Sequence, residues 1–239
     1  MNFKYFFAFT LFASLLGFTI AQSIRGNGDI DRETRSVSEF EGISASGIFD
    51  ISFRQSPNYR VEITTDENIM PLVETKVENG ILKLRIKKGT RKITKLEAKI
   101  SGPYLTSLSL SGATEFEVDS DLETGELKIN MSGAAEAEIP YLLANNLQLT
   151  LSGSSELTIE DGKIDEAKAN LSGASEYVAS GNKTESFHVV ASGASDARVW
   201  VIDDLVVKAS GASDVDCKGN PNRKSIKSSG ASDVHVASH

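Results

Sequence analysis

The sequence predicts an all-β protein, a single-stranded parallel β-helix (solenoid) with about 20 residues per coil. Three observations predict it. A five-residue motif of the type Ser-Gly-Ala-Ser-Asp/Glu occurs seven times, successive copies start 18–21 residues apart, and apolar and polar residues alternate on both sides of each copy. Repeats of this length indicate a stacked architecture, either a leucine-rich horseshoe or a β-solenoid. The Asn/Cys and Leu framework of leucine-rich repeats is missing, which favours the solenoid.

The first residues are typical of a secretory signal. Lys4 precedes the apolar run YFFAFTLFASLLGFTI, and Ala21 precedes a polar residue. We expect residues 1–21 to be a signal peptide cleaved after Ala21, the alternative being a retained membrane anchor. No second run of spanning length follows, so we expect no transmembrane segment after signal removal. The expected location is the periplasm, the outer cell surface or the extracellular space.

Charge and cysteine content narrow the function classes. The net charge of −8 becomes −9 when the signal removes Lys4, and an acidic chain is a poor partner for nucleic acid. Cys217 is the only cysteine, so no internal disulfide forms, and its place in an apolar column predicts a buried thiol. The three histidines form no Ser-His-Asp or metal-ligand pattern. We therefore expect no catalytic residues, no metal site, no cofactor and no enzyme activity.

Residues 22–100 are strand-rich without the regular repeat. The segment FEGISASGIFDISFRQ, at 40–55, contains an early Ser46-Gly47 followed by alternating apolar residues. A short helix is expected around 66–73, and Asn79-Gly80 predicts a hairpin turn. We expect this part to begin the solenoid and to cover its first coil, because stacked repeats need a cap.

Residues 101–239 contain the repeat proper. Apolar residues alternate before each motif, as in Leu147, Leu149 and Leu151, and again after it, as in Leu157 and Ile159. This period of two predicts two short strands per coil with inward columns that stack between coils. Turn-rich segments such as EDGKID and SGNKTES are expected to close the coil.

The motif itself predicts a corner between the two strands. Glycine accepts backbone angles and close approach that a side chain forbids, and the serines are expected to bond turn backbone or one another. The structural corner glycines are Gly112, Gly133, Gly153, Gly173, Gly193, Gly211 and Gly230.

The fifth residue of the motif is always acidic. The seven positions should form one column: Glu115, Glu136, Glu156, Glu176, Asp196, Asp214 and Asp233. Adjacent strands lie about 4.8 Å apart, so neighbouring carboxylates repel by roughly 1 kcal/mol even in water. A compensating role is expected, either capping of corner amides or Ca²⁺ held between coils. One carboxylate per coil favours weak cation association over a dedicated calcium site.

Three further features are candidate binding surfaces. Trp200 is expected to be exposed at a strand end, as a sugar-stacking residue or packed on a loop. Lys83, Arg85 and Lys87 share one strand face, either a solvated edge that blocks strand addition or a patch for anionic glycan, lipid headgroups or the acidic column of another protomer. The last coil, SGASDVHVASH, leaves a strand edge uncovered, which predicts a homo-oligomer or docking on a partner.

The chain resembles a known family of exported bacterial proteins, the putative auto-transporter adhesin, head GIN domain family. The resemblance rests on FEGISASGIFDISFRQ, on VEITTDENI and VENGILKLRI, and on the LSGASE-type repeats, and covers the mature chain. It implies a right-handed parallel β-helix at the cell surface or in the periplasm, and carries over neither a ligand nor catalytic residues.

These observations lead to one functional expectation with two alternatives. We expect a non-enzymatic, exported binding or adhesion module that presents Ser and Asp/Glu ladders to a glycan, a cell-surface component or a protein partner. The first alternative is a structural or envelope-stress-associated periplasmic protein without a dedicated ligand. The second is a polysaccharide-active enzyme, since parallel β-helices include such enzymes.

Overall fold

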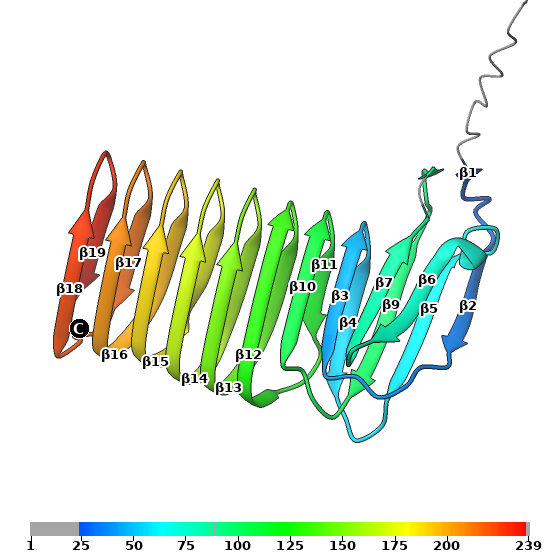
Figure 1. Ribbon diagram of the computed structural model, residues 1–239, viewed down its shortest axis with the longest axis horizontal. Helices are drawn as coiled ribbons and strands as arrows, with labels where there is room; N and C mark the ends of the chain where they lie inside the picture. The colour runs from blue at the N-terminus through cyan, green and yellow to red at the C-terminus, as the bar shows by residue number, and fades with distance from the viewer. Residues whose placement is uncertain (1–23, 88, 238–239) are drawn as a thin grey trace, which may run out of the picture.

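The protein is a stack of β-strands in which neighbouring coils pair in parallel (Figure 1). The computed structural model describes residues 24–87 and 89–237. The two ends of the described chain lie at opposite ends of the stack (Figure 1). The predicted parallel β-solenoid is confirmed. The predicted signal peptide, residues 1–21, lies outside the described residues.

The repeat region forms ten strands. They are β10 (Ser107–Gly112), β11 (Glu115–Val118), β12 (Leu122–Gly133), β13 (Glu136–Leu151), β14 (Glu156–Leu171), β15 (Glu176–Ala191), β16 (Asp196–Ala209), β17 (Asp214–Lys218), β18 (Arg223–Ser228) and β19 (Asp233–Ala237). Equivalent residues of successive coils pair, as in the column Leu147, Ala167 and Phe187. Each coil therefore buries the apolar face of the one before it.

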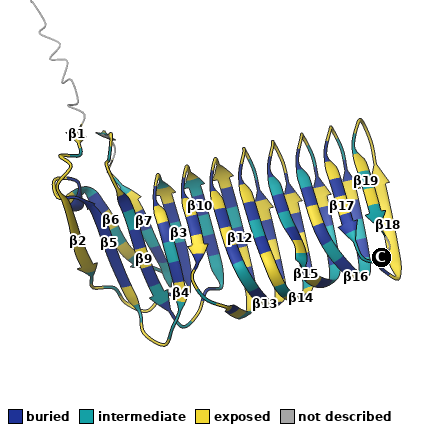
Figure 2. Ribbon diagram, turned by 180° about the vertical axis from the view of Figure 1, so that it is seen from behind, coloured by how far each residue is buried: buried dark blue, intermediate teal, exposed yellow. Residues whose placement is uncertain are grey.

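The predicted inward columns form the core. Side chains alternate between buried and exposed along each strand, which Figure 2 shows as bands of dark blue and yellow. Cys217 is buried in its column, 2% exposed, between apolar neighbours. In the last coil, Val234 and Val236 are only half-buried, because no described strand covers their far side.

Each full coil is one long bent strand rather than two short strands joined by a turn. In β13 the buried positions are first Ala137 and Ile139, then Leu142 and Ala144, and then Leu147 onward. Two shifts of the inward phase mark two bends. Parallel pairing resumes at the bends, as Tyr141 pairs with Asp161 and Lys163 with Lys183, so EDGKID and SGNKTES belong to long strands and not to loops. The expectation of turns there was wrong because interstrand hydrogen bonds hold the bends extended.

The coil length varies without breaking the stack. Successive corner serines Ser192 and Ser210 lie only 18 residues apart. The pairing of β15 with β16 shifts register between Ala179 and Lys183 and again between Thr184 and Ser186. These irregularities sit at the bends, so the corner on one side and the inward columns on the other stay in register.

The N-terminal part begins the same stack. Strands β3 (Gly42–Gly47) and β4 (Asp50–Gln55) pair in parallel with β10 and β11 and form the first coil. The chain then adds β5 (Arg60–Asp66), β6 (Val73–Glu78), β7 (Ile81–Ile86), β8 (Thr90–Arg91) and β9 (Leu96–Gly102) before it enters the second coil. Strands β7 and β9 pair in parallel with β3 and β4, on the side away from the repeats.

Antiparallel strands lie beyond β7 and β9. Strand β6 pairs with β7, β5 pairs with β9, and β2 (Ile30–Arg35) pairs with β5. The short β1 (Ile24–Arg25) pairs with β8.

The hairpin predicted at Asn79-Gly80 is confirmed, with φ of 52° and 74°. The helix expected around 66–73 is a single 3-10 turn, Met70–Leu72. In the described part of the chain, no helix is long and apolar enough to cross a membrane.

Candidate binding surfaces

The corner glycines stack into one column along the solenoid. Each of the seven has a positive φ, between 76° and 86°. A Cβ on Gly173 would lie 2.6 Å from the carbonyl oxygen of Gly153 in the preceding coil, so only glycine fits. Gly47, paired with Gly112, is an eighth member that the fold adds.

The corner serines bond to backbone. The Oγ of Ser152 donates to the carbonyl of Met131 at 3.3 Å, and Ser172 Oγ donates to Leu151 at 3.4 Å. The fourth residue of the motif points inward, and Ser155 Oγ donates to the carbonyl of Ser152 at 3.0 Å. These hydroxyl groups satisfy corner carbonyls, which gives the serines a structural use alongside the predicted binding role.

The acidic residues share one register across all coils, here called the acidic column. Interstrand pairing joins Glu115, Glu136, Glu156, Glu176, Asp196, Asp214 and Asp233 in that order. Pairing extends the column to Asp50 of the first coil and to Glu97 of β9. Asp50 follows Ser46-Gly47 at the spacing of the motif, so its place in the acidic column could have been predicted from the sequence.

The carboxylates of the acidic column take little part in holding the fold together. Their backbone amides pair with the preceding coil, as Glu136 N does with Thr114 O at 3.0 Å. Among the described residues, Asp233 is the one member whose carboxylate accepts a backbone amide, that of Val234. Capping of corner amides therefore does not account for the column. Of the ion pairs in the described structure, two involve the column: Glu176 pairs with Arg198, and Glu97 at its N-terminal end pairs with Lys95.

A second row of acidic residues lies beside the acidic column. Glu117 and Glu138 lie two residues further along β11 and β13, and a hollow of about 120 Å³ opens between the rows. Burial raises the pKa of the Glu138 carboxyl, and Glu160, Glu117 and Glu136 raise it further. The pKa of Glu156 is raised by burial and then by Glu176 and Glu136. Like charges thus face one another, and no metal-binding cluster of His, Cys, Asp or Glu occurs in the described ranges.

Trp200 was expected to be exposed, but the structure places it in a half-buried position. The ammonium groups of Lys183 and Lys218, from the coils on either side, lie 4.9 and 4.1 Å from its ring centroid. A Cβ on Gly219 would lie 2.9 Å from the ring. The indole is therefore packed between coils, and a role in sugar stacking stays a prediction.

The basic residues of β7 are placed differently from the predicted edge. Strand β6 pairs with β7, so Lys83, Arg85 and Lys87 do not block an edge. Lys83 forms an ion pair with Glu78, which leaves Arg85 and Lys87 as the exposed cations of the three. The Lys76 and Lys83 ammonium groups lower the pKa of Glu78 to about 2.

A family model described as "Putative auto-transporter adhesin, head GIN domain" matches residues 39–221. The chain belongs to this family. The matched range of the head GIN domain runs from just before the first coil to the connection between β17 and β18. No match was found among curated proteins.

Solved structures share the fold of this head GIN domain. An adhesin-named structure from Bacteroides fragilis aligns with a TM-score of 0.83 at 22% identity, over 90% of this chain and 100% of that one. A second, from Parabacteroides merdae, gives 0.71 at 23% identity, over 90% and 98%. A protein from Parabacteroides distasonis, named for lipid binding, gives 0.69 at 22% identity, over 90% and 99%.

Family membership sets the broad role. The family description names adhesion, which supports a non-enzymatic, adhesin-like role and an exported protein. The surfaces described above are therefore candidate binding surfaces of this head GIN domain.

Proposed function

We propose that this head GIN domain is an exported, non-enzymatic adhesion module whose acidic column binds a glycan or protein component of a cell surface. One observation carries the proposal. Carboxylates are repeated in every coil although they repel one another and make few bonds within the protein. Residues kept at a cost to stability are typical of functional surfaces.

The chemistry of the column defines what it can bind. Ionised carboxylates only accept hydrogen bonds, so the ligand must supply donors. Sugar hydroxyls, amines and guanidinium groups are such donors. The regular spacing along the stack suits an extended or repetitive ligand, since each coil offers the same acceptor in the same place.

The test is binding to glycan arrays and to bacterial and host cells, using the mature protein. The variant E115Q/E136Q/E156Q/E176Q keeps the size of the four side chains but removes their charge. We expect it to lose most binding and to unfold at the same or a higher temperature, because repulsion is relieved. Repetition at low and high salt separates a cationic protein partner, whose binding weakens with salt, from a neutral glycan.

The matched control carries four Glu-to-Gln changes at exposed positions away from the column, E67Q/E74Q/E123Q/E126Q. It has the same net charge as the test variant and should bind like the wild type. Equal binding by all three proteins would contradict the proposal. Absence of any surface binding by the wild type would instead favour a periplasmic structural protein, and fractionation of cells would locate it.

A further inference from the structure

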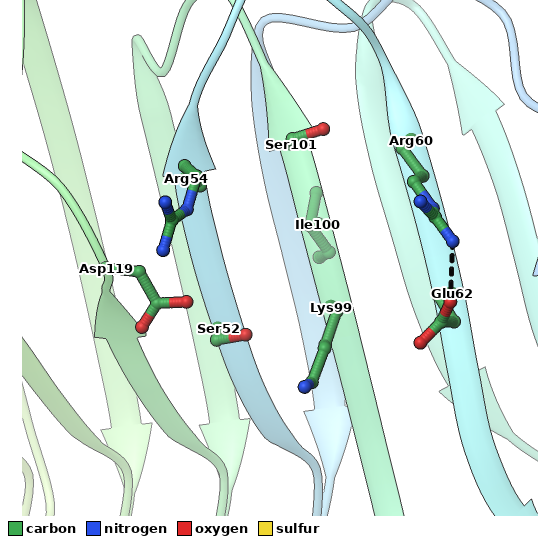
Figure 3. Close-up of a pocket in the computed structure, with 8 residues that line it drawn as sticks. All are labelled: Ser52, Arg54, Arg60, Glu62, Lys99, Ile100, Ser101 and Asp119. Carbon is green, nitrogen blue, oxygen red and sulfur yellow. Dashed lines mark hydrogen bonds and ion pairs between the residues drawn. The ribbon is translucent and has the colours of Figure 1, made fainter.

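A second surface feature lies at the N-terminal end of the stack, over β4, β9 and β5. It is a trough of about 370 Å³ lined by Ser52, Arg54, Arg60, Glu62, Lys99, Ile100, Ser101 and Asp119 (Figure 3). A neighbouring hollow of about 400 Å³ shares Ser52, Lys99 and Asp119 with it. Volumes of this size are typical of small-molecule sites.

Strand pairing builds the trough in two rows. Arg60, Ser101 and Arg54 lie side by side on β5, β9 and β4 in the first row. In the second row Glu62, Lys99 and Ser52 do the same. Because residues two apart face the same side of a sheet, all six side chains project from the outer face. Figure 3 shows Arg54 and Asp119 on one side, Arg60 and Glu62 on the other, and Lys99 with the serines between them.

The acid on the β5 side is already paired. Glu62 is 8% exposed, and its carboxylate contacts Arg60 at 2.8 Å and Arg32 at 3.3 Å. Both oxygens of the Glu62 carboxylate are therefore paired, and the ion pair fixes the Arg60 guanidinium at the wall of the trough. Because two cations share one acid, this side is electrostatically positive.

Two further cations of the trough, one at the opposite side and one at the centre, lack such a partner. Within the described ranges, neither Arg54 nor Lys99 forms an ion pair, and both are exposed. Ser101 Oγ donates to the carbonyl of Asn58 at 2.9 Å, so its lone pairs remain available. The three cations and two carboxylates of the lining leave one net positive charge, which matches a singly charged anion.

We propose that this trough binds one acidic sugar residue, a polyhydroxylated ring that carries a carboxylate. Arg54 and Lys99 receive the carboxylate through charge-assisted hydrogen bonds, which are stronger than neutral ones. Asp119 accepts hydrogen bonds from ring hydroxyls, and Ser52 and Ser101 contact the ring from the floor. The trough adjoins the N-terminal end of the acidic column, because Asp50 and Glu97 line the neighbouring hollow, but none of its own lining residues belongs to the column. Its ligand also has the opposite charge, so failure of either proposal leaves the other standing.

The test titrates the mature protein with sodium glucuronate, glucose and sodium sulfate, using calorimetry and amide chemical shifts. We expect saturable glucuronate binding, with shifts confined to β4, β5, β9 and the residues around Asp119. The variant R54Q/K99Q should weaken it by about tenfold or more, the effect of losing charge-assisted bonds. The control K128Q/K208Q changes two exposed lysines of β12 and β16 and should stay within about twofold of the wild type.

Two further comparisons keep the proposal open to refutation. D119N should weaken glucuronate binding, because Asp119 contacts the ring, but should leave sulfate binding unchanged or tighter, because the variant removes a negative charge from the lining. Thermal melts check that each variant is folded, which we expect because Arg54 and Lys99 form no ion pair among the described residues. No saturable binding of glucuronate, or equal affinity for glucuronate and sulfate, would overturn the proposal.

Discussion

Single residues in the corner decide whether coils can stack at the observed distance. At Gly173 the backbone has a φ of 79°, and the nearest atoms to an added Cβ belong to the backbone of Gly153. Backbone atoms in the middle of a stack have no room to yield, since the same contact recurs in the next coil. The corner glycines are therefore a steric requirement of the fold.

The first prediction follows for Gly173→Ala. Alanine would add a strained φ and a backbone clash, so we expect a loss of about 1–3 kcal/mol or more in the free energy of unfolding. Urea unfolding followed by circular dichroism measures it. Gly125→Ala is the control, because Gly125 has open space around its Cβ position, and it should change stability by less than about 0.5 kcal/mol. Equal effects of the two changes would refute the steric explanation.

A buried carboxylate secures the N-terminal segment. Asp66 is fully buried and accepts hydrogen bonds from the amides of Gly28 and Thr94, both at 2.8 Å. Burial alone would raise the pKa of this carboxyl, but the bonds from Thr94 and Gly28 outweigh it and lower the pKa below the ordinary 3.8. The ionised form therefore stabilises the folded state.

The second prediction concerns pH. Since the folded pKa of Asp66 is lowered, its contribution is present above the unfolded pKa and is lost as the pH falls from about 4 through the folded value. We expect Asp66→Asn to melt several degrees below the wild type at pH 7, by an effect of about 1–3 kcal/mol. The gap should narrow below pH 4. A gap that is the same at pH 7 and pH 3 would show that charge is not the cause.

At the scale of the strand, the core is built from columns that balance large and small residues. Tyr177 of β15 lies between Leu157 and Ala197, and Phe187 lies between Ala167 and Leu205. Their ring centroids are 6.0 Å apart. Small neighbours make room for each ring, so the cross-section of the coil stays nearly constant.

The third prediction uses the hydroxyl of Tyr177. It is buried without a hydrogen-bond partner in the described structure, and burial raises its pKa. Tyr177→Phe removes that unpaired group while keeping the ring, so we expect unchanged or higher stability, by up to about 1 kcal/mol. Tyr177→Ala should cost about 3–5 kcal/mol by leaving a cavity. Denaturant unfolding of both variants checks this, and a clear loss in Tyr177→Phe would mean that the hydroxyl has an unseen partner.

At the scale of the whole molecule, the stack is nearly one-dimensional. The strands of each coil pair only with those of adjacent coils in the described repeat region, so the stability of the stack is approximately a sum over adjacent pairs. The first coil of β3 and β4 continues the same columns, so we propose that residues 22–100 and 101–239 unfold as one unit. The antiparallel strands then act as the N-terminal cap.

The fourth prediction tests this modular construction by removing one coil. Deletion of residues 133–152 joins Ser132 to Gly153, which restores the corner. We expect a folded protein that is less stable and shorter by one strand spacing, about 4.8 Å. Circular dichroism and small-angle X-ray scattering measure the two effects. Deletion of residues 133–142 breaks the register between coils and should abolish the fold. Equal tolerance of both deletions would refute the modular construction of the stack.

The amino-acid sequence alone determined the repeat length, the corner and the side of the sheet that the residues next to the motif face. These properties depend on alternation within a few residues and on the spacing of the motif, as in Ser152, Gly153 and Leu157. The acidic column could be predicted for the same reason, because identical positions of equal repeats must align. Its second row was missed, since Glu117 and Glu138 belong to only two coils.

The tertiary structure decided which distant segments become neighbours. Pairing of β3 with β10 joins Gly47 to Gly112, 65 residues further along the chain. The motif spacing already marked Asp50, and the pairing of β4 with β11 decided that its neighbour in the column is Glu115. The trough arises because β4, β5 and β9 meet in a register that no local pattern encodes. Trp200 is covered by lysines from two other coils for the same reason. Alternation fixes the face of a side chain, whereas only the pairing of strands fixes the side chains beside it.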